Sequence, residues 1–456
     1  MSDKWQLTEP LIGYIILGNG PDSEIPAVLR DTGKRIELTV PFKDIRAIPG
    51  NWFVASRESV NGVLYFGNQI PDTMPHDFLF ACNGDSFALA GCRVSGNTRS
   101  MGLGIGTGTA VPTYVVCGAR NSRYAEINGL RTQWLDAVRW FNLPSMTYHV
   151  EQDEEGKCQG VEVCSKSIPP VLVDEKLGLS IRPNFNVTQL TKNDSVISHQ
   201  LVYIETKTDV AKSWEEHLAT HRAIKDLISI ADWNSREFID MSAMSTDDSE
   251  NIGGKGAVRD RWSPVVSYYP LVKRDNNENF QNTFLFDYRD IGNAGILKWL
   301  DLRKDCEQGM TSLSYLARDH SHLALETMSM LVGTTLECVG WYIVQSKHLE
   351  KWIKKSHGKE QPSSYQDMLK AIIEKNGIGD FFKNSLLWTK TMRDVYIGNK
   401  HADAHSSDFQ TTYEATMQSL VVLRVWLGLQ LGADIVNMKN RLASDAIGKH
   451  IPHLLA

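Results

Sequence analysis

The sequence predicts an α+β fold in which a β-rich N-terminal half is followed by an all-α helical bundle. Short apolar runs, separated by turn-forming pairs such as Pro49-Gly50 and Asn83-Gly84, fill the first 120 residues. After Gly292 the pattern changes to apolar residues at helical spacing. The chain has 456 residues, which is enough for two or three compact domains.

The N-terminal half is expected to form a sandwich or curled sheet with helices. Residues 128–142 have a helical period, with Leu130, Trp134 and Val138 on one side, and predict a helix. We assign residues 1–145 to a β-rich N-terminal domain. Its strands are expected at residues 11–17, 35–40, 62–66, 78–82 and 113–117.

Residues 146–290 are expected to be a mixed α/β continuation of this half. A helix is predicted from about Lys212 to Trp233, with Trp214, Leu218 and Ile228 as core candidates. Strands are expected at residues 160–164, 198–205, 238–244, 265–269 and 284–288. Polar stretches at residues 245–260 and 274–281 predict exposed loops.

Residues 291–456 predict the helical bundle. The last long helix is expected to begin at Ser407, because Gln410 three residues later matches a capping box. The apolar stretch 328–344 is short for a membrane span and contains Glu337, so we expect a buried helix and no membrane contact. A clean helical stripe is formed by Tyr365, Met368, Leu369, Ile372 and Ile373.

The composition limits the classes of function. Hydrophobic residues make up 42% of the chain and charged residues 22%, which is the balance of a folded soluble protein. The net charge of -6 excludes a global positive field, so any RNA contact must be a local patch. Seven cysteines without a CxxC pair, and a beginning without a signal-peptide pattern, predict a cytoplasmic protein.

Residues 391–405 carry the most suggestive chemistry. Seven residues separate Arg393 from His401, and Asp394 follows the arginine. Cleavage of RNA without a metal needs a group that titrates near neutrality to take the 2′-hydroxyl proton, which suits histidine. It also needs a fixed cation that stabilises charge growing on the phosphorus oxygens, which suits arginine. Asp394 could hold the guanidinium in place.

The position of His401 relative to Arg393 depends on the helix between them. On an unbroken helix the two side chains would point about 80° apart. Gly398-Asn399 favours a break, which would fold His401 back toward Arg393. The alternative is that the two residues are an ordinary solvated pair.

This stretch resembles the motif of the HEPN ribonucleases, in which an arginine, usually followed by a polar residue, precedes a histidine by four to six residues. Asp394 fills the polar position, and the spacing of seven is slightly longer. The N-terminal half resembles the N-terminal domain of ApeA-like proteins at residues 87–96, 102–108 and 123–130. That family joins a β-rich N-terminal domain to a C-terminal HEPN bundle and acts in bacterial anti-phage defence by abortive infection.

The resemblance implies a metal-independent endoribonuclease without a cofactor. His401 would act as base or acid, Arg393 as phosphate stabiliser and Asp394 as support. HEPN domains usually pair, so a homodimer would place two motifs in one cleft and leave a 2′,3′-cyclic phosphate and a 5′-hydroxyl. An RNA substrate such as transfer RNA, and a phage-derived trigger at the N-terminal domain, are also implied. Because degenerate HEPN domains exist, a non-catalytic dimerisation or nucleotide-binding module is the alternative.

Basic side chains near the motif are the candidates for RNA binding. Lys400 could touch a phosphate. His405 would share a helical face with His401 and could assist in RNA binding; the alternative is an ordinary surface histidine. The densest basic run, residues 348–355, could guide an RNA backbone or form a solvated amphipathic helix. The lysines of this run that we single out are Lys351, Lys354 and Lys355.

Other groupings compete with this site. A rival Arg/His cluster, too short in spacing for the motif, is formed by Arg318, His320 and His322. Metal ligands could come from His401, Asp403 and His405. No carboxylate cluster stands beside these three, so we expect no metal. His217 and His221 have helical spacing but lack the HExxH order, and they are expected to be exposed.

Overall fold

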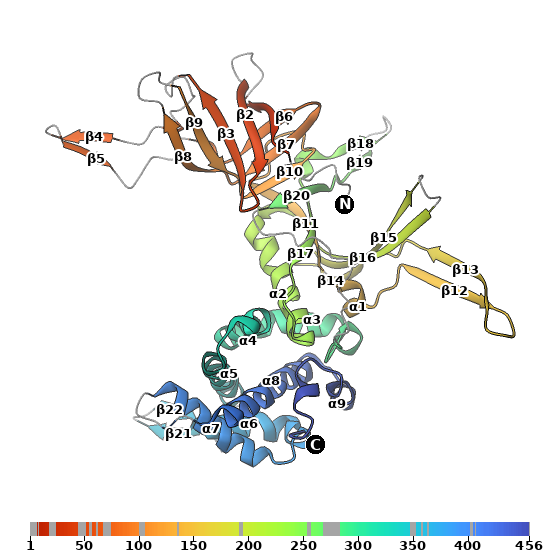
Figure 1. The fold of residues 1–456 in the computed structure, drawn as a ribbon, viewed down its shortest axis with the longest axis vertical. Helices are drawn as coiled ribbons and strands as arrows, with labels where there is room; N and C mark the ends of the chain where they lie inside the picture. The colour runs from red at the N-terminus through yellow and green to blue at the C-terminus, as the bar shows by residue number, and fades with distance from the viewer. Residues whose placement is uncertain are drawn as a thin grey trace.

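The computed structural model has a β-rich N-terminal half and a helical C-terminal region, as the sequence predicts (Figure 1). Helix α2 descends from the sheet to the bundle and joins the two parts. The structure describes residues 7, 9–17, 24–43, 52–53, 57–60, 63–66, 74–99, 105–134, 136–190, 195–252, 257–267, 283–346, 353–356, 359–362, 364–401, 405 and 407–455.

Fourteen strands form one antiparallel sheet, in the order β14-β15-β16-β11-β17-β20-β10-β7-β6-β1-β2-β3-β9-β8. Four further hairpins lie outside it: β4-β5, β12-β13, β18-β19 and β21-β22. The strands of the large sheet are β1 (Leu11–Ile16), β2 (Glu24–Asp31), β3 (Ile36–Phe42), β6 (Phe78–Cys82), β7 (Asp85–Ala90), β8 (Arg93–Arg99), β9 (Gly106–Val111), β10 (Tyr114–Cys117), β11 (Glu126–Trp134), β14 (Val171–Asp174), β15 (Leu179–Leu190), β16 (Ser195–Ser213), β17 (Phe238–Met244) and β20 (Ser263–Ser267). The hairpin strands are β4 (Arg57–Val60), β5 (Val63–Phe66), β12 (Met146–Gln152), β13 (Cys158–Ser165), β18 (Glu250–Ile252), β19 (Ala257–Arg259), β21 (Ile353–Ser356) and β22 (Lys359–Pro362).

The helices are concentrated in the C-terminal part. Only α1 and α2 lie within the β-rich half of the described chain. In chain order the helices are α1 (Ala137–Phe141), α2 (Trp214–Asp232), α3 (Tyr288–Asp305), α4 (Glu307–Asp319), α5 (Leu325–Ser346), α6 (Tyr365–Asn376), α7 (Ser385–Lys400), α8 (Phe409–Leu431) and α9 (Ile435–Leu442).

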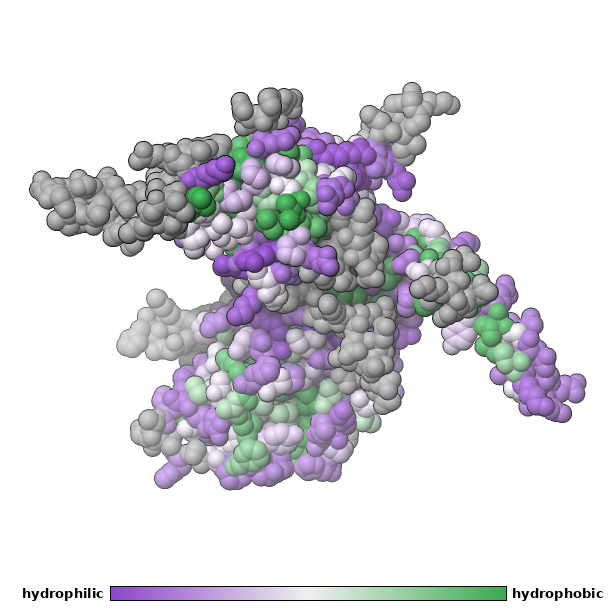
Figure 2. All heavy atoms as spheres, turned by 45° about the horizontal axis from the view of Figure 1, so that its top comes forward, coloured by the Kyte–Doolittle hydropathy of each residue, from purple (hydrophilic) through white to green (hydrophobic). Residues whose placement is uncertain are grey.

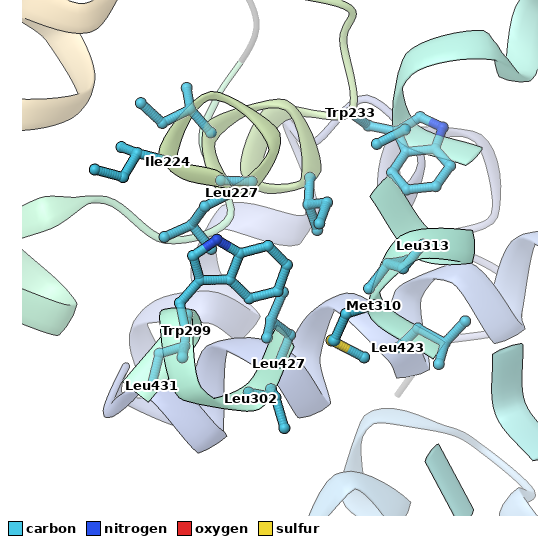
Figure 3. Packing of buried hydrophobic residues seen from close by; sticks show 14 of the residues in the cluster. Ile224, Leu227, Trp233, Trp299, Leu302, Met310, Leu313, Leu423, Leu427 and Leu431 are labelled. Carbon is cyan, nitrogen blue, oxygen red and sulfur yellow. The ribbon is translucent and has the colours of Figure 1, made fainter. Parts of the chain in front are cut away.

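One hydrophobic core runs through both parts of the molecule. A smaller core lies among β1–β3 and β6–β10, whereas the larger one extends from Ala88 in the sheet to Ile451 near the C-terminus. Trp299 of α3 belongs to this larger core and lies close to Leu227 of α2 and Leu427 of α8 (Figure 3). The Trp299 indole N–H donates to the backbone oxygen of Ala223 in α2 at 2.7 Å. The sheet half and the bundle are therefore packed against each other, not merely linked.

Helix α5 contains the apolar stretch 328–344, which the sequence analysis compared with a membrane-spanning helix. Residues 325–345 are long and apolar enough to cross a membrane, but 56% of the apolar window is buried inside the bundle. Val332, Leu336 and Val339 are fully covered by neighbouring helices. The expectation of a buried bundle helix is confirmed.

Several predicted elements are wrong in detail. Leu130 and Trp134 belong to strand β11, and only Ala137–Phe141 is helical. β11 is a central strand buried on both faces, so its apolar residues do not alternate and mimic a helical period. The predicted strand at residues 284–288 is an irregular buried segment that leads into α3. Helix α8 begins after Asp408, whose carboxylate accepts from the backbone N–H of Thr411, and not at Ser407.

Candidate functional site

Helix α7 carries the predicted motif. Its N-cap is Asn384, whose side chain accepts from the backbone N–H of Leu387 at 2.9 Å. Trp388, Met392 and Val395 recur at helical spacing and are buried in the bundle. These contacts fix which face of α7 points outward.

The predicted break at Gly398-Asn399 is wrong, because α7 continues through both residues to Lys400. The Asn399 side chain donates to Ser329 Oγ of α5 at 2.6 Å, which holds this end of the helix against its neighbour. Glycine costs a helix only about 1 kcal/mol, so tertiary packing overrides its preference for a turn. His401 is the C-cap, with its backbone N–H bonded to Ile397 O at 3.1 Å.

The Arg393 guanidinium is held by two side chains. Its Nε and Nη2 donate to Asp394 Oδ1 at 2.9 and 2.6 Å, and its Nη1 donates to Gln366 Oε1 of α6 at 3.1 Å. The side chain remains 36% exposed. Asp394 thus contacts Arg393 as its predicted supporting role requires, and Gln366 is a second holder that the sequence did not reveal.

His401 is exposed at the end of α7 but is not folded back toward Arg393. Eight residue steps along the helix separate the two Cα atoms by roughly 12 Å. Both residues nevertheless belong to the outward half of α7, on either side of Ile397. Within one copy of the protein, the His401 imidazole and the Arg393 guanidinium therefore both face solvent, but they are too far apart to contact the same phosphate group.

Lys400 is exposed but turned toward α5. Its Nζ donates to the hydroxyl of Tyr396 at 3.2 Å and lies 4.9 Å from the centre of that ring. The Tyr396 hydroxyl in turn donates to Glu337 Oε2 at 2.8 Å. The hydrogen bond to Tyr396 raises the pKa of Lys400, with the Glu337 charge contributing. Glu337 is the only charged residue in the apolar stretch 328–344, and that carboxylate was the signal that could have pointed to this cluster.

The remaining basic candidates are not gathered at the site by the part of the chain that the structure describes. His405 is exposed. Lys351 lies outside the described residues, as do the side chains of Lys354 and Lys355. The backbone of the last two belongs to hairpin β21-β22 (Ile353–Ser356 and Lys359–Pro362), so the alternative of an amphipathic helix is wrong there.

A groove of about 1060 Å³ opens beside this cluster, between α4, α5 and α6. Thr334 and Glu337, which also contact Tyr396, form part of its wall, and Trp341 contributes an indole that is 45% exposed. Thr334 and Glu337 therefore connect the groove to α7, because they line the groove and also contact Tyr396 of that helix.

The rival groupings have structural roles. His320 lies against Trp233, with 5.4 Å between ring centres, and burial lowers its pKa. His217 and His221 are buried, not exposed: both share the Thr206 hydroxyl, at 2.7 and 3.0 Å. Among the described residues no group of three or more histidine, cysteine, aspartate or glutamate side chains could hold a metal ion. Asp403 lies outside the described residues.

Fold and site together define a two-part protein: a large antiparallel sheet joined to a helical bundle that presents an Arg-Asp-His helix on its surface. Residues 10–299 match the family model described as ApeA N-terminal domain 1, which covers 290 of the 456 residues. The chain therefore belongs to the ApeA family and is an ApeA-type anti-phage defence protein. No curated protein and no solved structure matches it.

Proposed function

We propose that this protein is an anti-phage endoribonuclease of the HEPN type, which cleaves RNA without a metal ion through Arg393, Asp394 and His401. The observation that carries the proposal is the outward face of α7, where Asp394 and Gln366 fix the Arg393 guanidinium and an exposed histidine, His401, follows about two turns further along. A preorganised cation of this kind lowers the barrier to phosphodiester cleavage because no reorganisation is needed as charge develops.

The chemistry follows from the properties of these groups. His401 takes the proton from a 2′-hydroxyl, and the resulting oxygen attacks the adjacent phosphorus. Arg393 stabilises the negative charge on the phosphorus oxygens, and a second histidine protonates the departing 5′-oxygen. The products are a 2′,3′-cyclic phosphate and a 5′-hydroxyl, with no metal or cofactor required.

A homodimer supplies the second histidine and explains the separation of Arg393 from His401. In two antiparallel α7 helices that cross at Ile397, residues whose numbers sum to twice 397 are level along the axes. Arg393 is then level with His401 of the partner subunit, and Asp394 with Lys400 of the partner subunit. Ile397 is 40% exposed, and Leu386 and Leu387 on the same outward half are 64% and 58% exposed. This apolar surface is suited to burial between two copies.

The remaining parts of the molecule have supporting roles in this proposal. The groove beside Trp341 gives unpaired bases of an RNA, such as a transfer RNA loop, a surface on which to stack. The β-rich half restrains the nuclease until a phage-derived trigger binds it, within the bacterial cytoplasm.

The test is incubation of the purified protein with total cellular RNA in two parallel series, one with Mg²⁺ and one with EDTA. Wild-type protein is expected to cut the RNA, and His401→Ala protein to leave it intact. Mapping of the fragment ends should find 2′,3′-cyclic phosphates. Wild-type protein that leaves the RNA intact in both series would instead support a non-catalytic HEPN module, and cleavage by wild-type protein in Mg²⁺ that disappears in EDTA would support a metal nuclease.

A further inference from the structure

Hairpin β12-β13 (Met146–Gln152 and Cys158–Ser165) projects from the body of the molecule as an arm (Figure 1). Its root is attached to the large sheet: the Gln200 side chain donates to Met146 O at 3.2 Å, and the hydroxyls of Ser165 and Ser198 lie 3.5 Å apart. Beyond this root the arm's residues are exposed on both faces. The arm is thus anchored at one end and presented to solvent along its length.

One face of the arm is apolar. Tyr148 pairs with Val163, and Val150 pairs with Val161, so all four side chains lie on the same side of the hairpin. Their exposed fractions are 79%, 53%, 37% and 60%. Figure 2 shows hydrophobic side chains along the arm and hydrophilic ones toward its end. Four adjacent exposed apolar residues, unlike scattered single ones, mark an interaction surface.

The arm is also strongly acidic. Five carboxylates and one lysine give residues 146–165 a net charge of 1 − 5 = −4. Glu151 and Glu162 lie on the face opposite the apolar one, and the remaining carboxylates are at the turn. The only lysine, Lys157, is already paired with Glu155 at 2.6 Å. The charge therefore favours a basic partner and disfavours the arm of a second copy, which would bring another net charge of −4.

The backbone of the arm adds a third feature. β12 and β13 form a sheet of two strands only, so each has an outer edge that no described strand covers. An unpaired edge offers backbone N–H and C=O groups to an extended segment of another chain. Such a segment would continue both faces of the arm, since side chains alternate along every strand.

We propose that this arm binds a β-strand of a partner protein in which apolar residues alternate with lysine or arginine. The added strand pairs with the free edge of the arm. Its apolar side chains extend the Tyr148–Val163 face, and its basic side chains meet Glu151 when it pairs with the edge of β12 or Glu162 when it pairs with the edge of β13. This surface lies on the half of the protein to which no catalytic group is assigned, so the inference does not depend on ribonuclease activity.

The experiment measures binding of a fluorescein-labelled peptide of alternating valine and lysine to the full-length protein by fluorescence anisotropy. Replacing the apolar pair, Tyr148→Ser with Val163→Ser, is expected to weaken binding about tenfold or more, since the contact loses two large buried groups. The charge variant, Glu151→Gln with Glu162→Gln, is expected to weaken binding and to reduce its salt dependence, since the net charge of the arm falls from −4 to −2.

The matched control is Thr147→Ser with Cys164→Ser, which alters the neighbouring cross-strand pair on the opposite face and should leave affinity unchanged. All the altered residues are exposed, and circular dichroism checks that the fold is retained. Equal affinity in wild-type and Tyr148→Ser/Val163→Ser proteins would overturn the proposal. So would equally tight binding of a peptide of alternating valine and glutamate, or a change of the Tyr148→Ser/Val163→Ser protein from dimer to monomer in sedimentation.

Discussion

Two arginines on adjacent helices show how differently this protein uses one residue type. Arg424 of α8 is fully buried, whereas Arg393 of α7 is 36% exposed. Arg424 forms a bidentate pair with Asp445 at 2.8 and 2.7 Å and donates to the backbone oxygens of Ile230 and Ala231 at the end of α2, each at 2.8 Å. It connects the bundle to the helix that comes from the sheet.

Arg393 is held less completely. Three of the five N–H donors of its guanidinium bind described residues. The acceptors of these three hydrogen bonds are the side chains of Asp394 and Gln366. Arg424 uses four of its five N–H donors within the fold and is closed off from solvent, whereas the exposed Arg393 keeps two N–H donors that no described residue occupies. Removing Arg424 should therefore damage the fold, and removing Arg393 should damage function.

The largest expected effect is that of Arg424→Met on stability. The substitution leaves the buried Asp445 carboxylate without its cation and two backbone oxygens without their donor, which should cost about 3–5 kcal/mol. Denaturant unfolding at neutral pH measures the loss. Adding Asp445→Asn to Arg424→Met removes the uncompensated charge, keeps an oxygen for the backbone N–H groups of Ile447 and Gly448, and should restore part of the stability; no recovery would show that the backbone contacts to α2, and not the ion pair, dominate.

Arg393→Ala tests the other side of the comparison. If the proposed function is correct, RNA cleavage should fall about 10²–10³-fold, since one charge-stabilising donor group is lost. The free energy of unfolding should change by no more than about 0.5 kcal/mol, because the side chain is at the surface. The matched control is Arg318→Ala, which removes an arginine paired with the next residue, Asp319, at 3.0 Å and similarly exposed. Loss of cleavage in the control but not in Arg393→Ala would reverse the assignment.

Ile397→Glu tests whether RNA cleavage by the exposed face of α7 requires a second copy of the protein. A charge at the centre of the proposed crossing should convert the dimer to a monomer in sedimentation velocity and reduce cleavage to about the level of Arg393→Ala. Leu172→Glu, on the distant strand β14 and 52% exposed, is the control for a surface charge. Full cleavage by monomeric Ile397→Glu protein would contradict the shared site.

The smallest expected effect is that of acidification on folding stability. It allows a second comparison of one residue type, between the buried His221 and the exposed His401. Burial lowers the pKa of His221 to about 3, whereas unfolded histidine titrates near 6.5. Below pH ~6.5 the unfolded chain thus binds a proton that the folded chain refuses, and stability should fall by about 1.4 kcal/mol per pH unit for this residue. Urea unfolding between pH ~6.5 and ~5 measures the slope.

The slope should be smaller in His221→Gln protein, which lacks the buried imidazole, and His401→Ala serves as the control in which an exposed histidine is removed. Burial also lowers the pKa of His217, so part of the pH dependence of stability should remain in His221→Gln protein. An identical slope in wild-type and His221→Gln proteins would mean that other groups control the acid sensitivity.

The sequence predicted the order of the two halves and the local pieces of the site better than their arrangement. Helix α6 was recognised from its stripe, because one side of it faces the core and the other faces solvent. Strand β11 was mistaken for a helix, because both its faces are buried and the period of two disappears. Gln366 and Glu337 were missed, since they reach α7 from helices distant in sequence.

By itself the sequence indicated where strands give way to helices, drew attention to the stretch that holds Arg393, Asp394 and His401, and placed the chain with ApeA-like proteins. These follow from local periodicity and from short stretches of residues. Only the tertiary structure decided that α7 continues through Gly398, that Arg424 is buried and Arg393 open, and that His221 lies under the sheet. Burial depends on contacts between residues far apart in the chain, which no local pattern contains.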